Sequence, residues 1–360
     1  NTGLAFGPGG ALYLADWMNG PSERGRIWKL DDPAAASSPA RKRTREWLAA
    51  GAGKLSLVEL VASLAEPDVR VRKAAQFELV RRGDKGRDAL SIVATQPKSR
   101  LARLHAIWGL GQIARGWPEA AEANPAAVLP LRELLGDPDS EIRAQAAKVL
   151  GESRDAASAA PLLARLRDDS PRVRYHAALA LGKLENPASV KPLFALLREN
   201  ADKDSFLRHA AVMGLVGSTK ADPAPLLAAA KSPDLSIRLA AVLALRRHAH
   251  AGIAAFLKDE DGYLLTEVAR AIHDDFSIPE ALPALAEILD RPNLSGEPLL
   301  RRVINANFRV GRPEDATRLA RYAARKDAPQ NMRTTALAGL ALWPQPPVLD
   351  AVEGRFRKHA

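Results

Sequence analysis

A repeat of about 31 residues recurs along this chain and is clearest between Ser170 and Asn200. Pro171 is expected to open its first helix, whose apolar residues stand at helical spacing: Val173, Ala177 and Leu181. Gly182 and the turn-forming pair Asn186-Pro187 are expected to end this helix.

A second helix is expected from about Ala188, with Pro192 in its first turn, where a missing N–H costs nothing. Its apolar face is predicted to consist of Leu193, Leu196 and Leu197. Neither helix can bury its apolar face alone, so the repeat predicts a stack of helix pairs.

Six copies of the first helix share one pattern: an apolar residue, then Arg, two variable positions and Ala, with Leu four positions later. The alanines are Ala75, Ala106, Ala146, Ala177, Ala211 and Ala241, and the leucines are Leu79, Leu110, Leu150, Leu181, Leu215 and Leu245. Small alanine at the tightest contact lets two helices approach closely. A proline expected in the first turn marks the second helix of five repeats: Pro130, Pro161, Pro192, Pro225 and Pro283.

Two helices in a period of about 31 residues resemble the HEAT-like repeat, in the short form shared with phycobilin-lyase proteins. We therefore expect an all-α, HEAT-like α-solenoid over residues 55–360, a right-handed superhelix of helix pairs. Its core must consist of Ala, Leu and Val, because 47% of the chain is hydrophobic but only 5% is aromatic. Gly116-Trp117-Pro118 is expected to lie in an insertion that bulges from one edge.

Residues 1–30 do not fit the repeat and predict a short β segment of three strands: Leu4–Phe6, Ala11–Trp17 and Arg26–Leu30, with a second turn from Asn19 to Gly25. Three short strands are too few to form a core of their own. The stretches LAFGPGGALYLADW and GRIWKL resemble the last blade of the six-bladed propeller of soluble sugar dehydrogenases. This resemblance implies a propeller remnant, with most of the propeller upstream and a neighbouring blade over the apolar side chains of Phe6, Leu12, Leu14, Ile27, Trp28 and Leu30. The alternative is a small sheet that caps the solenoid.

Residues 31–54 are expected to be a linker leading into a first helix through Trp47 and Leu48. The basic run Arg41-Lys42-Arg43, with Arg45, could contact phosphate, but a solvated face is the simpler interpretation.

The recurring charges predict a structural ladder and not a catalytic site, because a catalytic pair is needed once. Four aspartates stand just ahead of first helices, where a carboxylate can cap free N–H groups: Asp68, Asp139, Asp204 and Asp234. The recurring arginine is then expected near the aspartate of an adjacent repeat.

The histidines are the remaining candidates for a ligand site. His105 and His176 occupy the same position in their repeats, and His209 is one position away, so neighbouring repeats could bring such side chains together around a metal or haem. The intervening repeat has Gln145 at that position, which argues against a continuous pair. His248 and His250 are expected to flank a helix end, where a cation is favourable.

Composition excludes several classes of function. The chain has no cysteine, which excludes disulfides, thiolate metal sites, iron–sulfur clusters and thiol nucleophiles. No apolar run approaches the roughly 18 residues that span a bilayer, so no membrane insertion is expected. The chain contains no zinc-protease motif, nucleophile elbow or phosphate-binding loop. Because it begins with Asn and has no leader peptide, we interpret it as a processed protein or a fragment.

The last hundred residues depart from the simple repeat. They contain GYLLTEVARAIHDD, where Glu267 replaces the usual Arg register, then PEALPALAEIL, and RRVINANFRVG from Arg301 to Gly311. These stretches resemble the C-terminal HEAT portion of bacterial proteins described as membrane-bound dehydrogenases or PVC-type haem-binding proteins. Asn305 and Asn307 are expected to cap helices and form turns around Phe308, with a ligand role as the alternative.

Members of that family resemble a chain of propeller, HEAT solenoid and c-type cytochrome. The resemblance implies that haem c and any quinone cofactor belong to other parts of a parent protein in the periplasm or cell envelope, since this sequence has no C-x-x-C-H motif. No catalytic, cofactor-binding or metal-binding residue can be assigned. The sequence therefore predicts a non-catalytic scaffold whose partners are the propeller and cytochrome domains of the same chain, or other proteins on its concave face.

Two other classes of function stay open. A net charge of +10 would suit a nucleic-acid-binding HEAT protein. Such a protein would need basic and aromatic side chains on one concave face, and with four Tyr and six Trp, most of the latter in irregular segments, no specific nucleic acid is expected. A bilin-lyase-like enzyme shares the short repeat, but it would need an acid–base pair that the sequence does not reveal.

Overall fold

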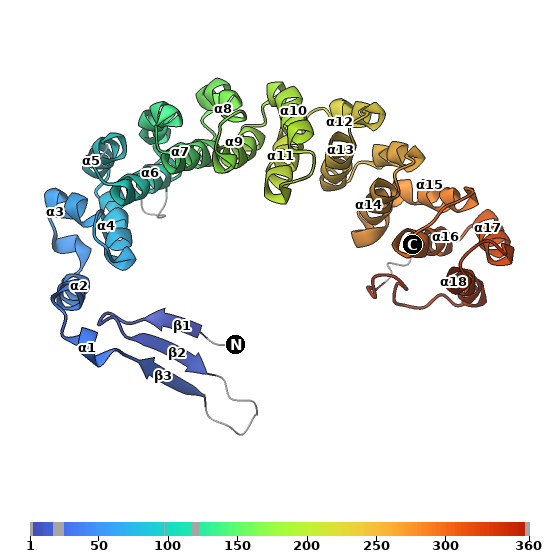
Figure 1. The fold of residues 1–360 in the computed structure, drawn as a ribbon, viewed down its shortest axis with the longest axis horizontal. Coiled ribbons are helices and arrows are strands. Elements are labelled where there is room, and N and C mark those ends of the chain that lie inside the picture. Colours follow the sequence, from blue (N-terminus) through green and yellow to red (C-terminus); the bar gives the residue numbers. More distant parts are fainter. Residues whose placement is uncertain (1–2, 17–24, 97, 117–121, 357–360) are drawn as a thin grey trace. The chain divides into compact units, whose positions relative to one another are not determined.

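The computed structural model describes residues 3–16, 25–96, 98–116 and 122–356. The chain divides into two compact units, residues 1–161 and 162–360. Helix pairs build both units, and a small sheet precedes them (Figure 1). The predicted fold class, a HEAT-like α-solenoid with a short N-terminal β segment, is confirmed. None of the described helices is long and apolar enough to cross a membrane.

The first unit opens with a three-stranded antiparallel sheet of β1 (Gly3–Phe6), β2 (Leu12–Asp16) and β3 (Arg26–Leu30). The third strand has the predicted bounds. Trp17 and most of the predicted turn that follows it lie outside the described residues. In the register, Leu14 lies between Leu4 and Trp28, and Leu12 lies between Phe6 and Leu30. Because alternate residues of a strand share a face, these six side chains occupy one face of the sheet.

The segment predicted as a linker and a first helix contains two α-helices. Asp32 caps α1 (Pro33–Ala36) and Ser38 caps α2 (Pro39–Ala50), each followed by a proline whose fixed φ suits the first helical position. The remaining helices of this unit are η1 (Ala52–Lys54), α3 (Leu57–Ser63), α4 (Val69–Arg81), α5 (Asp84–Thr95), α6 (Arg100–Ala114), η2 (Pro125–Gly136), α7 (Ser140–Glu152) and η3 (Ala156–Ser158). The predicted insertion at Trp117 and Pro118 falls outside the described residues.

Helix α8 (Ala159–Arg165) spans the division, and the second unit continues with helix pairs. Its helices are α9 (Pro171–Lys183), η4 (Pro187–Ser189), α10 (Val190–Asn200), α11 (Ser205–Ser218), α12 (Ala224–Ala228), η5 (Ala229–Lys231), α13 (Leu235–Arg247), η6 (Ala251–Lys258), α14 (Gly262–His273), η7 (Asp274–Phe276), η8 (Pro279–Ala281), α15 (Leu282–Glu287), η9 (Ile288–Asp290), α16 (Glu297–Val310), α17 (Pro313–Ala324) and α18 (Gln330–Ala341). A turn closed by a bridge between Leu349 and Phe356 follows.

The repeat pattern correctly identifies the core. All six alanines and all six leucines of the pattern have a relative exposure of 0%. Four of the five predicted prolines lie in the first turn of a second helix: Pro161 in α8, Pro192 in α10, Pro225 in α12 and Pro283 in α15. The remaining second helix differs from the prediction. Pro130 lies in the middle of the 3₁₀ segment η2 and not in a first turn, because its ring and missing N–H disfavour an α-helix through that position.

Glycine allows a very close helix contact between α9 and α11. Gly182 was predicted to help end the first helix. It is the penultimate residue of α9, which ends at Lys183. A Cβ on Gly217 would lie 1.9 Å from the carbonyl oxygen of Gly182, and a Cβ on Gly182 would lie 2.6 Å from that of Met213. The two backbones therefore pack directly against each other.

Candidate functional site

The recurring arginine closes the turn ahead of its own helix. Its Nη1 donates to carbonyl oxygens five or six residues earlier, as in Arg72 to Glu66 (2.6 Å), Arg143 to Asp137 (2.8 Å), Arg174 to Asp168 (2.9 Å) and Arg238 to Ser232 (2.9 Å). The expected aspartate partner in the next repeat is found for Arg103 with Asp137 and for Arg238 with Asp259. These arginines are structural ties between repeats.

Three of the four predicted aspartate caps are present. Asp68, Asp139 and Asp204 each accept a backbone N–H two residues ahead, at 2.8 to 2.9 Å. Asp234 occupies the capping position without this bond, and its carboxylate accepts instead from Arg198 Nε at 2.8 Å.

His105 is buried between α4 and α6, within a series of hydrogen-bonded side chains. Arg72 Nε donates to its Nε2 (3.1 Å), so the ring proton lies on Nδ1, which donates to Gln76 Oε1 (2.7 Å). Gln76 in turn donates to Gln112 (2.9 Å). Burial, together with the charge of Arg72, lowers the pKa of His105 to about 4. This imidazole holds two helices together and is fully engaged by protein groups.

The other histidines do not join His105 in a common site. His176 belongs to the second unit, where its ring meets that of Tyr175 edge-on at 5.1 Å, and Gln145 accepts from Trp108 Nε1 (2.9 Å). His209 is exposed on α11. The expectation of a cation at the end of α13 is wrong for His248. Burial is the larger cause that lowers the pKa of this ring, and the charge of His250 is the smaller one. The Nε2 atom of His248 contacts Thr219 Oγ1 (3.1 Å).

A second buried polar cluster lies at the C-terminal end of the chain and joins α14, α16 and the turn of residues 349–356. His273 has no exposed surface. Asn305 Nδ2 contacts both His273 Nε2 (2.8 Å) and Asp350 Oδ2 (2.7 Å). An amide nitrogen can only donate, so Nε2 accepts and the Nδ1 proton is donated to Asp274 Oδ1 (3.0 Å). The imidazole in this arrangement is neutral.

Both aspartates of this C-terminal cluster are ionised. Burial opposes the charge of Asp274, but hydrogen bonds from His273 and Arg302 outweigh burial and hold the pKa of this carboxyl well below its usual range. Burial likewise opposes the charge of Asp350, and the Asn305 amide with two backbone N–H groups of the turn lowers its pKa.

Three groups of the C-terminal cluster have the composition of a metal site. His273, Asp274 and Glu353 offer donor atoms within 4.8 Å of one another. Arg302, however, donates Nε to Asp274 Oδ1 and Nη2 to Oδ2, both at 3.0 Å, and the His273 Nδ1 proton occupies the same carboxylate. A cation would have to displace a proton and compete with a guanidinium group. The protein's own groups therefore satisfy His273 and Asp274, and we assign no metal to the cluster.

The expectation that Asn305 and Asn307 cap helices is wrong. Both are buried inside α16, which continues to Val310 and ends at Gly311 with φ of 74°. Asn307 donates to the carbonyl of Ala286 (2.9 Å) and accepts from Arg318 (2.9 Å), which ties α16 to α15 and α17. Phe308 meets Trp343 edge-on at 5.7 Å, and Glu267 pairs with Arg270 at 2.8 Å. The repeat pattern indicated an unusual segment here but not its partners, which are 32 to 45 residues distant from Asn305.

The N-terminal sheet has an open apolar face. On the face that also carries Leu12 and Leu14, Leu4, Phe6, Trp28 and Leu30 are 66%, 65%, 48% and 53% exposed. The sheet is attached through its first turn, where Arg41 Nε donates to Gly9 O (2.7 Å) and Arg70 donates to Gly7 O. Arg41 is therefore a tie rather than part of a solvated face, whereas Lys42, Arg43 and Arg45 are exposed as expected.

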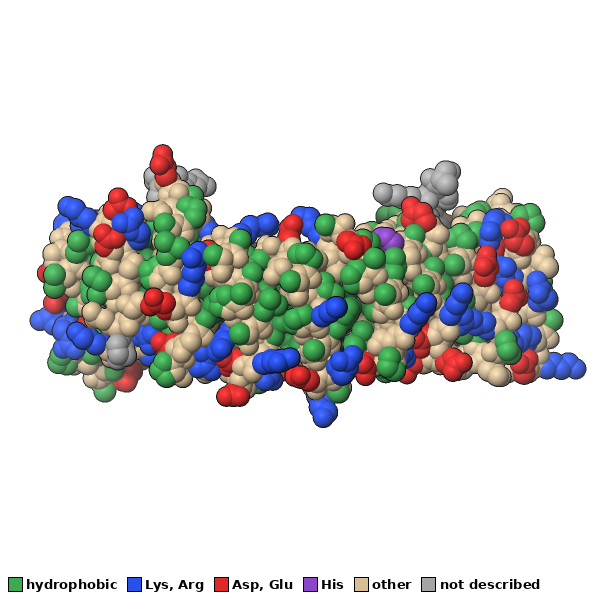
Figure 2. All heavy atoms as spheres, turned by 90° about the horizontal axis from the view of Figure 1, so that it is seen from above, with side chains coloured by type: hydrophobic (Ala, Val, Ile, Leu, Met, Phe, Trp, Pro, Cys, Tyr) green, Lys and Arg blue, Asp and Glu red, His purple; other side chains and the backbone are tan. Residues whose placement is uncertain are grey.

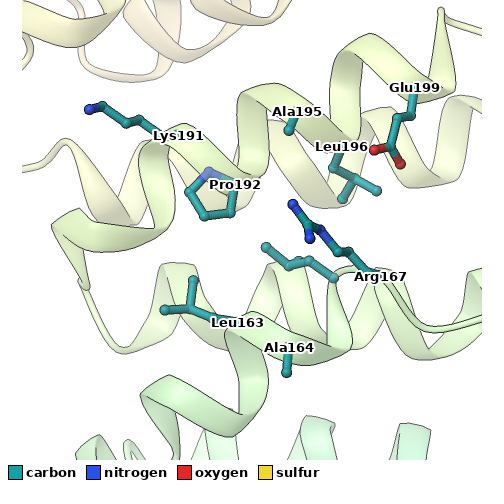
Figure 3. A pocket seen from close by; sticks show the side chains of 9 residues that line it. Leu163, Ala164, Arg167, Lys191, Pro192, Ala195, Leu196 and Glu199 are labelled. Atoms are coloured by element: carbon teal, nitrogen blue, oxygen red, sulfur yellow. The ribbon is translucent and has the colours of Figure 1, made fainter.

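Two kinds of groove mark the second unit. On the side of α8, α10 and α12, apolar side chains gather along the middle of the face (Figure 2). Between α8 and α10 a cavity of about 380 Å³ lies among Leu163, Pro192 and Leu196, with Arg167 and Glu199 at its rim (Figure 3). A second groove, of about 660 Å³, runs along α11 and α13 and is lined by basic side chains.

Comparisons with known proteins agree with this fold. The family model of HEAT repeats matches residues 115–173 and 128–216. No curated protein sequence matches the chain. The chain is similar to a solved structure of Kap95p with RanGDP, at 13% identity and a TM-score of 0.50, over 86% of this chain and 51% of that one. It is also similar to the CpcE–CpcF phycocyanin lyase complex of Nostoc sp. PCC7120, at 18% identity and a TM-score of 0.37, over 65% and 95% of the two chains. At 13% identity the similarity to the Kap95p structure concerns the fold alone.

Proposed function

We propose that this chain is a non-catalytic HEAT-repeat scaffold that carries the last blade of a β-propeller at its N-terminal end. HEAT-repeat proteins commonly bind other proteins, and the central repeats match the HEAT family model. The observation that carries the proposal is the open apolar face of the sheet. Four exposed large side chains on one small sheet form the kind of patch that marks a protein contact.

The parent protein in this proposal is an exported, dehydrogenase-like haem-binding protein of the periplasm or cell envelope. The propeller and a c-type cytochrome domain are then the partners of this chain, and they hold the haem c and any quinone cofactor. The solenoid keeps the two at a fixed separation, because the length of a repeat array is set repeat by repeat. Support for the propeller comes from the arrangement of the sheet: three antiparallel strands anchored at one turn, with large apolar side chains on one face.

Hydrogen exchange tests whether the sheet lacks a covering partner. Amides of residues 12–15 should exchange much faster than those of residues 177–181 in this chain, because sheet hydrogen bonds beside an uncovered face open locally. In the longer protein encoded by the flanking sequence, the same amides should slow by at least tenfold. Equal protection of the strands and the central repeats in this chain would make the sheet an integral cap and overturn the proposal.

A pair of variants tests which face is covered. Trp28→Glu should leave the stability of this chain within about 0.5 kcal/mol, as is usual for exposed positions, but should destabilise the longer protein. Lys29→Gln, on the opposite face of the same strand, loses only a partly exposed ion pair with Asp31; it is the control and should be tolerated in both. Flanking coding sequence without further blades upstream and C-x-x-C-H downstream would also contradict the proposed parent.

A further inference from the structure

The groove along α11 and α13 combines an apolar floor with a basic rim. Its floor consists of Val212, Met213 and Leu243. Its volume, about 660 Å³, lies within the range of about 300 to 1,000 Å³ that is typical of ligand sites. Ser205 and Ser277 also line it and add hydroxyl groups that can donate or accept hydrogen bonds. The site is therefore shaped for an elongated ligand with both polar and apolar parts.

The charge of the groove has one sign. Arg208, Arg246 and Arg247 line it together with His209, and there is no acidic side chain among the described residues that line it. Arg208 is paired with Asp202 outside the lining. Arg247 and His209 are exposed. The exposed cationic group of Arg247 and the exposed ring of His209, beside Arg208 and Arg246, make this groove a distinct surface feature.

We propose that this groove binds an acidic peptide segment of a partner protein. Guanidinium groups bind carboxylates in a fixed, paired geometry, and the apolar floor can take a leucine-like side chain between two acidic residues. The lining residues of α11 run from Ser205 to Met213, or roughly 12 Å of helix. An extended peptide of about four residues covers that length at about 3.3 Å per residue. The proposal deepens the scaffold function, on which it rests, by giving the chemistry of one partner.

The test is binding of a labelled peptide to the full chain. The probe is a fluorescein-labelled octapeptide of alternating Glu and Leu, followed by fluorescence anisotropy at about 150 mM salt. Saturable binding in the micromolar range is expected, and a peptide with Lys in place of Glu should bind at least tenfold more weakly. Failure of the Glu peptide to saturate below about 1 mM would overturn the proposal.

Matched variants locate the site. Arg247→Glu should weaken binding of the Glu–Leu peptide by at least tenfold, while Lys231→Glu, an exposed position with the same change of charge, should alter it less than twofold. Met213→Gln should weaken the Glu–Leu peptide several-fold but leave an all-Glu peptide unchanged, since only the former uses the apolar floor. Equal losses in the Arg247 and Lys231 variants would show non-specific attraction and reject the groove.

Competitors separate the sources of anionic charge. Millimolar inorganic phosphate that displaces the peptide would reassign the groove to phosphate, and duplex DNA that binds more tightly than the peptide through Arg247 would reassign it to nucleic acid. The scaffold function is tested on the sheet by hydrogen exchange. If the peptide does not bind but the amides of the sheet exchange slowly in the longer protein, the acidic peptide is rejected as a partner and the scaffold proposal stands.

Discussion

His105 is the residue at which burial and protonation are most directly coupled. Its pKa falls from 6.5 to about 4 because burial, and then the positive charge of Arg72, disfavour the protonated ring. A group whose folded pKa is depressed below its unfolded value binds protons better when unfolded. Its contribution to stability is therefore complete above pH 6.5 and is lost as the pH falls toward 4.

We expect the acid sensitivity of the chain to depend on His105. Lowering the pH from 7 to 4.5 should reduce the free energy of unfolding by about 2 to 3 kcal/mol through this ring. Each unit of difference between the folded and the unfolded pKa corresponds to about 1.4 kcal/mol. Urea unfolding at both pH values measures the loss, which should be smaller by this amount in His105→Gln. His209→Gln, which changes an exposed ring, should keep the wild-type difference. An unchanged pH dependence in His105→Gln would rule out this role.

Asn305 is expected to hold the C-terminal turn in place. Asn305→Ala would leave His273 Nε2 and Asp350 Oδ2 without the donated hydrogen bonds, at a cost of about 1 to 3 kcal/mol. Hydrogen exchange of the amides of residues 352–354 should accelerate in this variant. Asn331→Ala, an exposed asparagine that bonds Glu297, is the control and should leave these amides unchanged. Unaltered protection in both variants would disprove the coupling.

At the scale of the element, replacing a glycine of α11 by alanine is expected to have the opposite effect on stability from the usual one in a helix. Gly→Ala inside a helix normally stabilises by about 1 kcal/mol, because alanine has the higher helix propensity. Gly217→Ala would instead place a Cβ 1.9 Å from the Gly182 carbonyl oxygen, where backbone and not a flexible side chain must move.

Gly217→Ala should therefore destabilise the second unit by about 1 to 3 kcal/mol or more. Gly262→Ala at the start of α14 meets nothing within 4 Å and is the matched control, expected to be neutral or stabilising. Thermal unfolding followed by circular dichroism distinguishes the two. Equal midpoints would mean that α9 and α11 separate at little cost.

The sequence predicts first helices better than second helices for a physical reason. Ala177 and Leu181 recur at fixed spacing because each first helix packs between two neighbours, so composition and position report burial directly. The second helices are partly 3₁₀. A proline marks the first turn of α8, α10, α12 and α15 as predicted, but Pro130 lies in the middle of η2. The Asn305 cluster was missed because its hydrogen-bond partners come from a turn 45 residues later. A local pattern carries no information about such a contact.

At the scale of the whole molecule, the net charge of +10 is the property most open to misinterpretation. Many arginines tie repeats together by donating hydrogen bonds to carbonyl oxygens or aspartates, as Arg72, Arg103 and Arg238 do. Their guanidinium groups are therefore occupied by groups of the protein itself. A nucleic-acid site needs cationic and aromatic side chains along one continuous surface. The exposed aromatic side chains are instead spread over several elements and include Phe6 and Trp28 of the N-terminal sheet, Phe206 on α11, Tyr263 on α14 and Phe356 in the C-terminal turn.

Binding to duplex DNA should therefore be weak and without sequence preference, with a Kd on the order of 10⁻⁴ to 10⁻⁶ M at physiological salt. A fluorescence titration at about 150 mM salt measures it, and a repeat at about 50 mM salt should show much tighter binding because counterion release dominates. Arg247→Glu and Lys231→Glu should weaken this attraction to the same small extent, in contrast to their unequal effects on the acidic peptide. Nanomolar affinity, or a loss confined to one variant, would identify a genuine nucleic-acid surface.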